Sequence, residues 1–106
     1  MVESNSDFKS RIYSIVAKIP QGKLMTYGQI ATFCGHPNAA WQVGQIAHFG
    51  PTDLPWHRVV NKSGGLAKGW PGGGREAHRA LLLAENIDVS DNFIVDITTI
   101  RWTPSA

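Results

Sequence analysis

The segment TYGQIATFCGHPNAAWQVGQIAHF, residues 26–49, contains the signals for two short helices joined by a tight turn. Thr26 and Gln29 have the spacing of a capping box, in which the two side chains bond each other's backbone N–H groups at a helix start. Asn38 is a residue type that often caps helices, and it predicts a second helix over residues 39–49. Two short helices separated by such a turn predict a helix-turn-helix.

The second of these helices has an unusual polar face. At 100° per residue, its small and apolar side chains gather on one side, whereas Trp41, Gln45 and His48 lie opposite. An exposed aromatic between Gln and His is typical of a surface that contacts nucleic acid. The alternative is that Trp41 packs beneath a neighbouring loop.

The rest of the chain predicts a mainly α single domain over residues 1–106, with a small β element. Apolar spacing predicts a helix over residues 8–19, and residues 57–60, which end in two β-branched valines, predict a strand or turn. A glycine-rich loop follows at residues 64–74. We expect a last helix over residues 75–86 and a strand or extended arm over residues 93–98. The last helix is expected to point four side chains inward, namely Ala77, Ala80, Leu81 and Ala84.

Charge is distributed unevenly along the chain, although the net charge is only +2. Residues 58–79 hold five Lys or Arg and one Glu, a net of +4, whereas residues 80–106 hold four Asp or Glu and one Arg, a net of −3. A basic segment predicts a positive face for a polyanion, with ordinary solvated charge as the alternative. No apolar run approaches the roughly 20 residues of a membrane span. Together with a single cysteine, Cys34, expected to be buried and inert, this predicts a cytoplasmic protein without membrane contact.

The segment LPWHRVVN, residues 54–61, places Trp56 between a proline and a His-Arg pair, a position where a reactive side chain would be expected. Trp56 has neither a nucleophile nor a proton that titrates near neutral pH. His57 could act as a base, yet no adjacent group is available for it to activate. The histidines lack metal-ligand spacing, and the glycine-rich loop matches no phosphate-binding motif. The residues therefore favour a binding protein without metal, cofactor or catalytic residues.

Three segments, TYGQIA, HPNAAWQVG and PWHRVVN, resemble the DNA-binding domain of O6-alkylguanine-DNA alkyltransferases. In those enzymes the last motif reads Pro-Cys-His-Arg, and the cysteine accepts the alkyl group from a flipped guanine. With Trp56 at the position of that cysteine, the chain is identified as a member of the alkyltransferase-like branch, which is not enzymatic. The resemblance covers residues 8–87 and implies a winged-helix-like helix-turn-helix domain, as in the C-terminal domain of the alkyltransferases.

The resemblance also implies roles for individual residues. Tyr27 corresponds to a tyrosine near the target phosphate, Glu85 to a residue that orients His57, and Lys68 is the cation expected to contact guanine. The implied lesion-base pocket consists of Tyr27, Trp56, His57, Val59, Lys68, Gly69 and Trp70. The implied DNA-binding residues are Thr26, Tyr27, Ala40, Trp41, Gln42, Gly44, Gln45, His48 and Arg58.

One departure from the family concerns the helix that would enter the duplex. The family usually has Arg where this chain has Trp41, and that Arg fills the gap left by the flipped base. An indole could serve as a wedge between bases instead, at the loss of a cation. The alternative is that Trp41 rotates away and another side chain fills the gap.

The resemblance predicts a sensor that binds O6-alkylguanine in double-stranded DNA, flips the lesion into a pocket and signals it to nucleotide excision repair proteins of the UvrA type. We expect a monomer that is cytoplasmic, and nucleoid-associated when bound to DNA. One alternative is an alkyltransferase with another acceptor, with Cys34 the only thiol. A second alternative is a winged-helix regulator of unmodified DNA. We also expect Trp56→Ala to weaken lesion binding without disturbing the fold.

Overall fold

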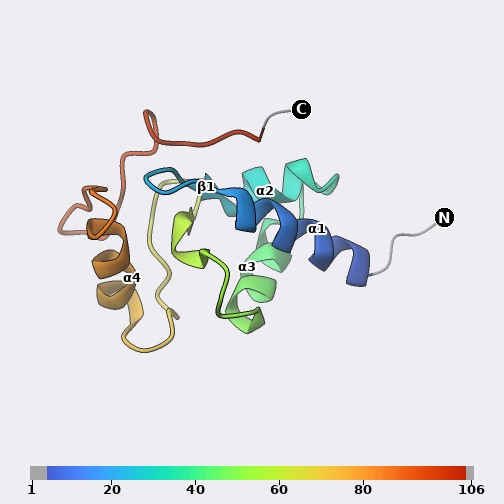
Figure 1. Cartoon of the computed structure of the whole chain (residues 1–106), viewed down its shortest axis with the longest axis horizontal. Coiled ribbons are helices and arrows are strands. Elements are labelled where there is room, and N and C mark those ends of the chain that lie inside the picture. Colours follow the sequence, from blue (N-terminus) through green and yellow to red (C-terminus); the bar gives the residue numbers. More distant parts are fainter. Residues whose placement is uncertain (1–4, 105–106) are drawn as a thin grey trace.

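The computed structural model describes residues 5–104 as four α-helices, a short 3-10 helix and a two-stranded sheet (Figure 1). The mainly α fold with a small β element, predicted from the sequence, is confirmed. No helix in the described range is long and apolar enough to cross a membrane. In chain order the elements are α1 (Asn5–Lys18), β1 (Met25–Thr26), α2 (Tyr27–Phe33), α3 (Ala40–Phe49), η1 (Trp56–Arg58), β2 (Val59–Val60) and α4 (Gly74–Leu83).

The helix-turn-helix consists of α2 and α3, which pack against each other. The capping box forms as predicted: the Thr26 hydroxyl accepts a hydrogen bond from the Gln29 backbone N–H at 3.0 Å, and the Gln29 side chain accepts one from the Thr26 N–H. The prediction for the start of α3 was wrong, because Ala39 and not Asn38 precedes the helix, with no side-chain cap. The backbone N–H of Ala39 instead bonds the carbonyl of His36, so the turn is closed by the main chain.

The two strands join the Trp56 segment to the helix-turn-helix. They are parallel, and Met25 pairs with Val59. Directly before β1, the backbone of Leu24 forms hydrogen bonds with the C-terminal segment, donating to Ile100 and accepting from Trp102. Residues 93–98, predicted as a strand or an extended arm, form no strand of several residues and contribute one isolated bridge, between Gly65 and Ile94.

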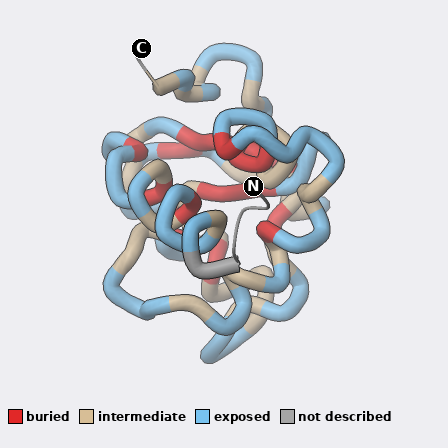
Figure 2. The backbone as a smooth tube through the Cα atoms, turned by 90° about the vertical axis from the view of Figure 1, so that its right-hand side faces the viewer, coloured by how far each residue is buried: buried red, intermediate tan, exposed pale blue. Residues whose placement is uncertain are grey.

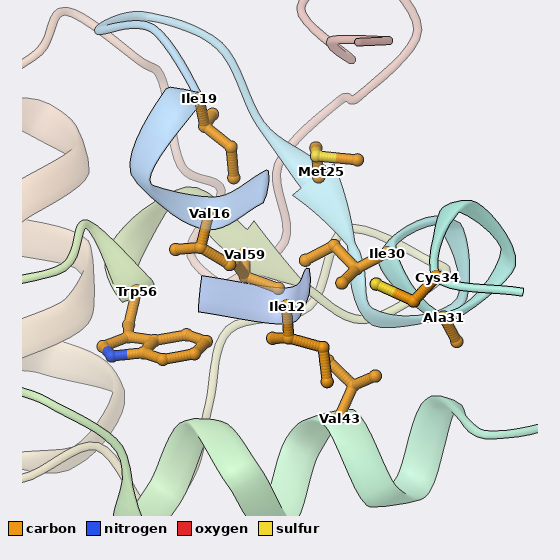
Figure 3. Packing of buried hydrophobic residues seen from close by; sticks show 10 residues of the cluster. All are labelled: Ile12, Val16, Ile19, Met25, Ile30, Ala31, Cys34, Val43, Trp56 and Val59. Atoms are coloured by element: carbon orange, nitrogen blue, oxygen red, sulfur yellow. The ribbon is translucent and has the colours of Figure 1, made fainter. Parts of the chain in front are cut away.

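The core has two parts, one on each side of the small sheet. Figure 2 shows the buried segments in the middle of the molecule, with exposed loops around them. Figure 3 shows the larger part, whose members are Ile12, Val16, Ile19, Met25, Ile30, Ala31, Cys34, Val43, Trp56 and Val59. The smaller part contains Leu24, Val60, Leu66, Leu82, Ile87 and Val95. The full burial of Cys34 confirms what its apolar helix face predicted.

The prediction for the last helix was wrong in its phase and its end. Its buried residues are His78 and Leu82, whereas Ala80, Leu81 and Ala84 are exposed and Ala77 is half-buried. The helix ends at Leu83, and the chain turns at Asn86, whose φ of 63° lies in the left-handed region. Apolar spacing indicated the wrong face because a polar residue, His78, is hydrogen-bonded inside the core.

Candidate nucleic-acid interface

An open cavity of about 1050 Å³ lies between α3, the loop of residues 50–55 and the glycine-rich loop. Its wall is rich in aromatic side chains and low in charge. The aromatic residues that line it are Tyr27, Trp41, Phe49, Trp56 and Trp70. A concave, mainly apolar site of this size is the kind of feature that binds a planar heterocycle.

Trp56 forms the inner wall of this cavity and is also part of the core. Its residue is only 7% exposed, and the indole N–H donates to the Pro51 carbonyl at 2.6 Å. The ring meets Tyr13 edge-on, with centroids 6.0 Å apart. A Cβ on Gly50 would lie 2.9 Å from the indole, so the loop can pack against Trp56 only with glycine there. The indole is therefore held in one position from several sides.

His57, next to Trp56 on the cavity wall, belongs to a charged network behind it. Its Nε2–H donates to Glu85 at 2.5 Å, and the Arg58 Nε donates to the same carboxylate at 2.9 Å. Burial alone would raise the pKa of Glu85, but hydrogen bonds from Arg58, from the Gly22 backbone N–H and from His57 lower it to about 2. The carboxylate is thus ionised at neutral pH and orients His57, as the family resemblance implied.

A second histidine, His78, fixes the glycine-rich loop against the same segment. Its Nδ1 accepts a hydrogen bond from the Ala67 N–H at 3.1 Å, and its Nε2–H donates to the His57 carbonyl at 2.8 Å. The ring stacks on Trp70 with centroids 4.4 Å apart. Burial lowers the pKa of His78, which keeps the ring neutral in the tautomer that both hydrogen bonds require. Sequence reasoning did not identify His78, because nothing in its spacing marked it as buried.

The exposed face of α3 forms the mouth of the cavity. Trp41 is 72% exposed and Phe49 is 79% exposed, while Gln45 and His48 line the cavity beside them. The alternative in which Trp41 packs beneath a loop is therefore wrong. Phe49 was missed by sequence reasoning, although its place at the end of an α3 face with Trp41, Gln45 and His48 was a usable signal.

The structure brings together most of the predicted site residues. The predicted residues that line the cavity are Tyr27, Ala40, Trp41, Gly44, Gln45, His48, Trp56, His57, Gly69 and Trp70. Val59 and Lys68 are not among the residues that line the cavity: the Val59 side chain is fully buried in the core, and Lys68 is exposed between two lining residues, Ala67 and Gly69. The contact expected from the Val59 carbonyl and the contact expected from the Lys68 side chain with the flipped base stay predictions.

Three predicted DNA-binding residues also lie away from the cavity wall. Thr26 is buried, and its hydroxyl is used to cap α2. Arg58 is bonded to Glu85 and to the Ile19 carbonyl at 2.8 Å, so its charge is neutralised inside the protein. Gln42 is exposed on α3 and stays a predicted DNA contact.

Comparison with known proteins places this geometry in a family. The family model for the DNA-binding domain of 6-O-methylguanine DNA methyltransferase matches residues 7–87. The chain belongs to this family. It is 41% identical over 103 residues to a DNA base-flipping protein of Escherichia coli, with 95% of this chain and 78% of the relative covered. It is 39% identical over 104 residues to alkyltransferase-like protein 1 of Schizosaccharomyces pombe, covering 92% of this chain and 96% of the relative.

Solved structures of family members have the same fold. The S. pombe protein Atl1, in complex with damaged DNA containing O6-carboxymethylguanine, matches with a TM-score of 0.87 at 30% identity, covering 96% of this chain and all of the other. The O6-methylguanine methyltransferase of Mycobacterium tuberculosis matches with a TM-score of 0.67 at 33% identity, and this chain covers 56% of it. The two relatives with 41% and 39% identity bear the names of base-flipping and alkyltransferase-like proteins rather than of methyltransferases.

Proposed function

We propose that this protein is a non-enzymatic sensor of DNA damage, which binds O6-alkylguanine in duplex DNA and holds the flipped base in the aromatic cavity. The observation that carries the proposal is the position of Trp56. It follows Pro55 in the motif where alkyltransferases have the acceptor cysteine, and its side chain lines the cavity beside His57. An indole cannot accept an alkyl group in place of a thiolate.

The only thiol of the chain does not replace the missing acceptor. Cys34 is fully buried in the core, among Ile12, Ile30 and Val43, and it does not line the cavity. Alkyl transfer to Cys34 would require a large opening of the core. The alternative of an alkyltransferase with a non-standard acceptor therefore has no support in the geometry.

The cavity supplies what a flipped base needs. Extruding a base from the duplex costs a few kcal/mol, and least for a base that pairs poorly. Stacking of a base on an aromatic ring returns about 1–3 kcal/mol. Trp56 is already fixed by the core and by Pro51, so little conformational entropy is lost when the base arrives. His57, oriented by Glu85, is the polar group that can bond the edge of the base.

The mouth of the cavity fits an approach to the duplex through α3. Ala40 and Gly44 have no bulky side chain, so the helix can come close to the DNA backbone. Trp41 projects beyond them and is the side chain we assign to the gap left by the flipped base. The exposure of Trp41 beside the cavity supports the wedge, and the alternative in which another residue fills that gap is tested by substituting Trp41.

A sensor without a nucleophile must pass the lesion to other proteins. We assign this step to nucleotide excision repair proteins of the UvrA type, and we propose that the protein acts in the cytoplasm as a monomer, associated with the nucleoid when bound to DNA. Analytical ultracentrifugation with and without duplex, and co-purification with a UvrA-type protein on lesion-bearing duplex, test these points. A dimer on the duplex, or capture that does not depend on the lesion, would contradict them.

The central experiment is a titration of two duplexes that differ only in one O6-methylguanine. We expect tighter binding of the lesion duplex, and an unchanged protein mass after incubation with it. Equal affinity for both duplexes would support a regulator of unmodified DNA instead. A methyl group found on the protein by mass spectrometry would establish an alkyltransferase.

A further inference from the structure

The cavity has an unusual balance of charge for a site that binds a polyanion. Asp53 is the only carboxylate among its lining residues, and no Lys or Arg of the described chain lines it. Five aromatic rings make up much of the remaining wall. The cation expected from the sequence, Lys68, lies outside.

Four arginines of the chain are engaged elsewhere in the structure. Arg58 is bonded to Glu85, and the Arg11 Nη1 donates to the Cys34 carbonyl at 2.8 Å. Arg75 and Arg79 lie over the Phe93 ring, 4.8 and 5.8 Å from its centre. Because the Glu85 carboxylate is ion-paired with Arg58 and hydrogen-bonded to His57, it does not give the cavity a strong negative charge either. Among the described residues that line the cavity, Asp53 is therefore a carboxylate with no Lys or Arg beside it.

We propose that this cavity distinguishes flipped bases by the charge of the O6 substituent, and that it prefers cationic and neutral substituents to anionic ones. This inference rests on the proposed function. The faces of indole and phenyl rings carry negative electrostatic potential and attract cations. An anionic substituent meets the same faces and Asp53 with no cation of the wall to compensate its lost hydration.

Three O6 substituents of guanine have similar size and shape but different charge, so comparing them isolates the effect of charge. O6-(2-aminoethyl)guanine is cationic at neutral pH, O6-(2-hydroxyethyl)guanine is neutral and O6-carboxymethylguanine is anionic. All three are attached to the same oxygen on the base-pairing edge of guanine, so they weaken base pairing in a similar way and the free energy needed to extrude the base is similar. The S. pombe structure contains the anionic member of this series, so a direct comparison with a relative is available.

The experiment measures the affinity of the protein for one duplex that carries each substituent in turn, and for the same duplex with guanine. We expect the aminoethyl duplex to bind about 3- to 10-fold more tightly than the hydroxyethyl duplex, the range of a cation on an aromatic face. We expect the carboxymethyl duplex to bind at least 3-fold more weakly than the hydroxyethyl duplex.

Two pairs of variants test the origin of the effect. Asp53→Asn is expected to reduce the ratio of aminoethyl to carboxymethyl affinity by about half, whereas Asp91→Asn, in an exposed turn outside the cavity, leaves it unchanged. Phe49→Leu is expected to reduce the ratio by a similar factor, whereas Phe33→Leu, the same change of an exposed aromatic outside the cavity, does not.

The outcomes separate the two proposals. If all three substituents bind more tightly than guanine but equally, or if the carboxymethyl duplex binds best, the charge preference is wrong and the lesion sensor stands. If none of the three binds more tightly than guanine, both are wrong. The order aminoethyl, hydroxyethyl, carboxymethyl, reduced by Asp53→Asn and not by Asp91→Asn, supports the charge preference.

Discussion

The inner wall of the cavity formed by Trp56, called the floor below, and its mouth on α3 both carry aromatic side chains, but these side chains differ in how far they are buried. At the floor, Trp56 is packed into the core and hydrogen-bonded to Pro51. At the mouth, Trp41 and Phe49 project from α3 with most of their surface in solvent. Trp56 at the floor therefore contributes to the stability of the fold, whereas the exposed side chains at the mouth contribute little to it.

This difference has a physical reason. A surface that receives a base binds more tightly when it is already fixed, because no side-chain entropy is lost on binding. A side chain that enters a base stack must instead be free to reach out of the protein. The difference predicts that substitutions at the floor affect stability first, and that those at the mouth affect binding alone.

The largest effect is expected for Trp56→Ala. The sequence suggested that this change would spare the fold, and the burial of Trp56 corrects that expectation. Loss of a buried indole typically costs about 3–5 kcal/mol in the free energy of unfolding. Urea denaturation measures it, with Trp41→Ala as the matched control, expected to change stability by less than about 0.5 kcal/mol. A loss below about 1 kcal/mol for Trp56→Ala would mean that the indole is not part of the core.

The network behind the floor is expected to give the next largest effect. Glu85→Gln removes a charged acceptor of three hydrogen-bond donors, and such bonds contribute about 1.5–3 kcal/mol. The folded pKa of Glu85, about 2, lies below its unfolded value of 4.5, so the unfolded state takes up a proton first as the pH falls. The stabilisation is therefore complete above about pH 4.5 and is lost between that pH and about pH 2.

The measurement is the free energy of unfolding from pH 2 to pH 7 for the wild type and for Glu85→Gln. The difference between the two should shrink below pH 4.5. Asp88→Asn, a change of an exposed carboxylate outside the network, serves as the control. A constant difference across this range would show that Glu85 contributes through shape and not through its charge.

The two regions also differ in how far the sequence predicted them. At the mouth, the position of Trp41 opposite the apolar face of α3 was predicted, since it follows from helix geometry alone, whereas Phe49 was missed. The family motif was needed to place Trp56 on a cavity wall. Its depth in the core was not predicted, because it depends on contacts with Tyr13 and the loop of residues 50–55, which are distant or irregular.

The glycine-rich loop was the least predictable part of the site. Lys68 was expected to contact guanine because the resembling family places polar or basic residues on the O6 side of the pocket, but Gly69 and Trp70 line the cavity and Lys68 does not. The conformation follows from His78 on α4, which accepts a hydrogen bond from the Ala67 N–H and stacks on Trp70. A buried polar residue that organises a loop has no local pattern, and the same residue shifted the inward face of α4.

Substitutions at the mouth are expected to change the affinity for DNA without changing the stability of the fold. Trp41→Ala removes the proposed wedge, and stacking on one base contributes about 1–3 kcal/mol to affinity. We expect lesion binding to weaken by that amount, measured by titration of an O6-methylguanine duplex. Phe33→Ala, which removes an exposed aromatic outside the cavity, is the control. Unchanged affinity for Trp41→Ala would mean that another side chain fills the gap in the duplex.

The smallest effect is expected when the wedge is given the charge that the family usually has there. Trp41→Arg retains a planar group that can stack, and it adds one cation near the phosphates. Each neutralised phosphate steepens the fall of log K with log salt by about 0.9, so between 50 and 200 mM salt the variant should lose about threefold more affinity than the wild type. Titrations at several salt concentrations measure this slope.

Asn92→Arg is the control, because it adds the same charge in an exposed turn outside the cavity and should leave the slope nearly unchanged. Equal steepening in both variants would show that added charge acts through the whole molecule, and that the mouth is no closer to the phosphates than the distant turn is.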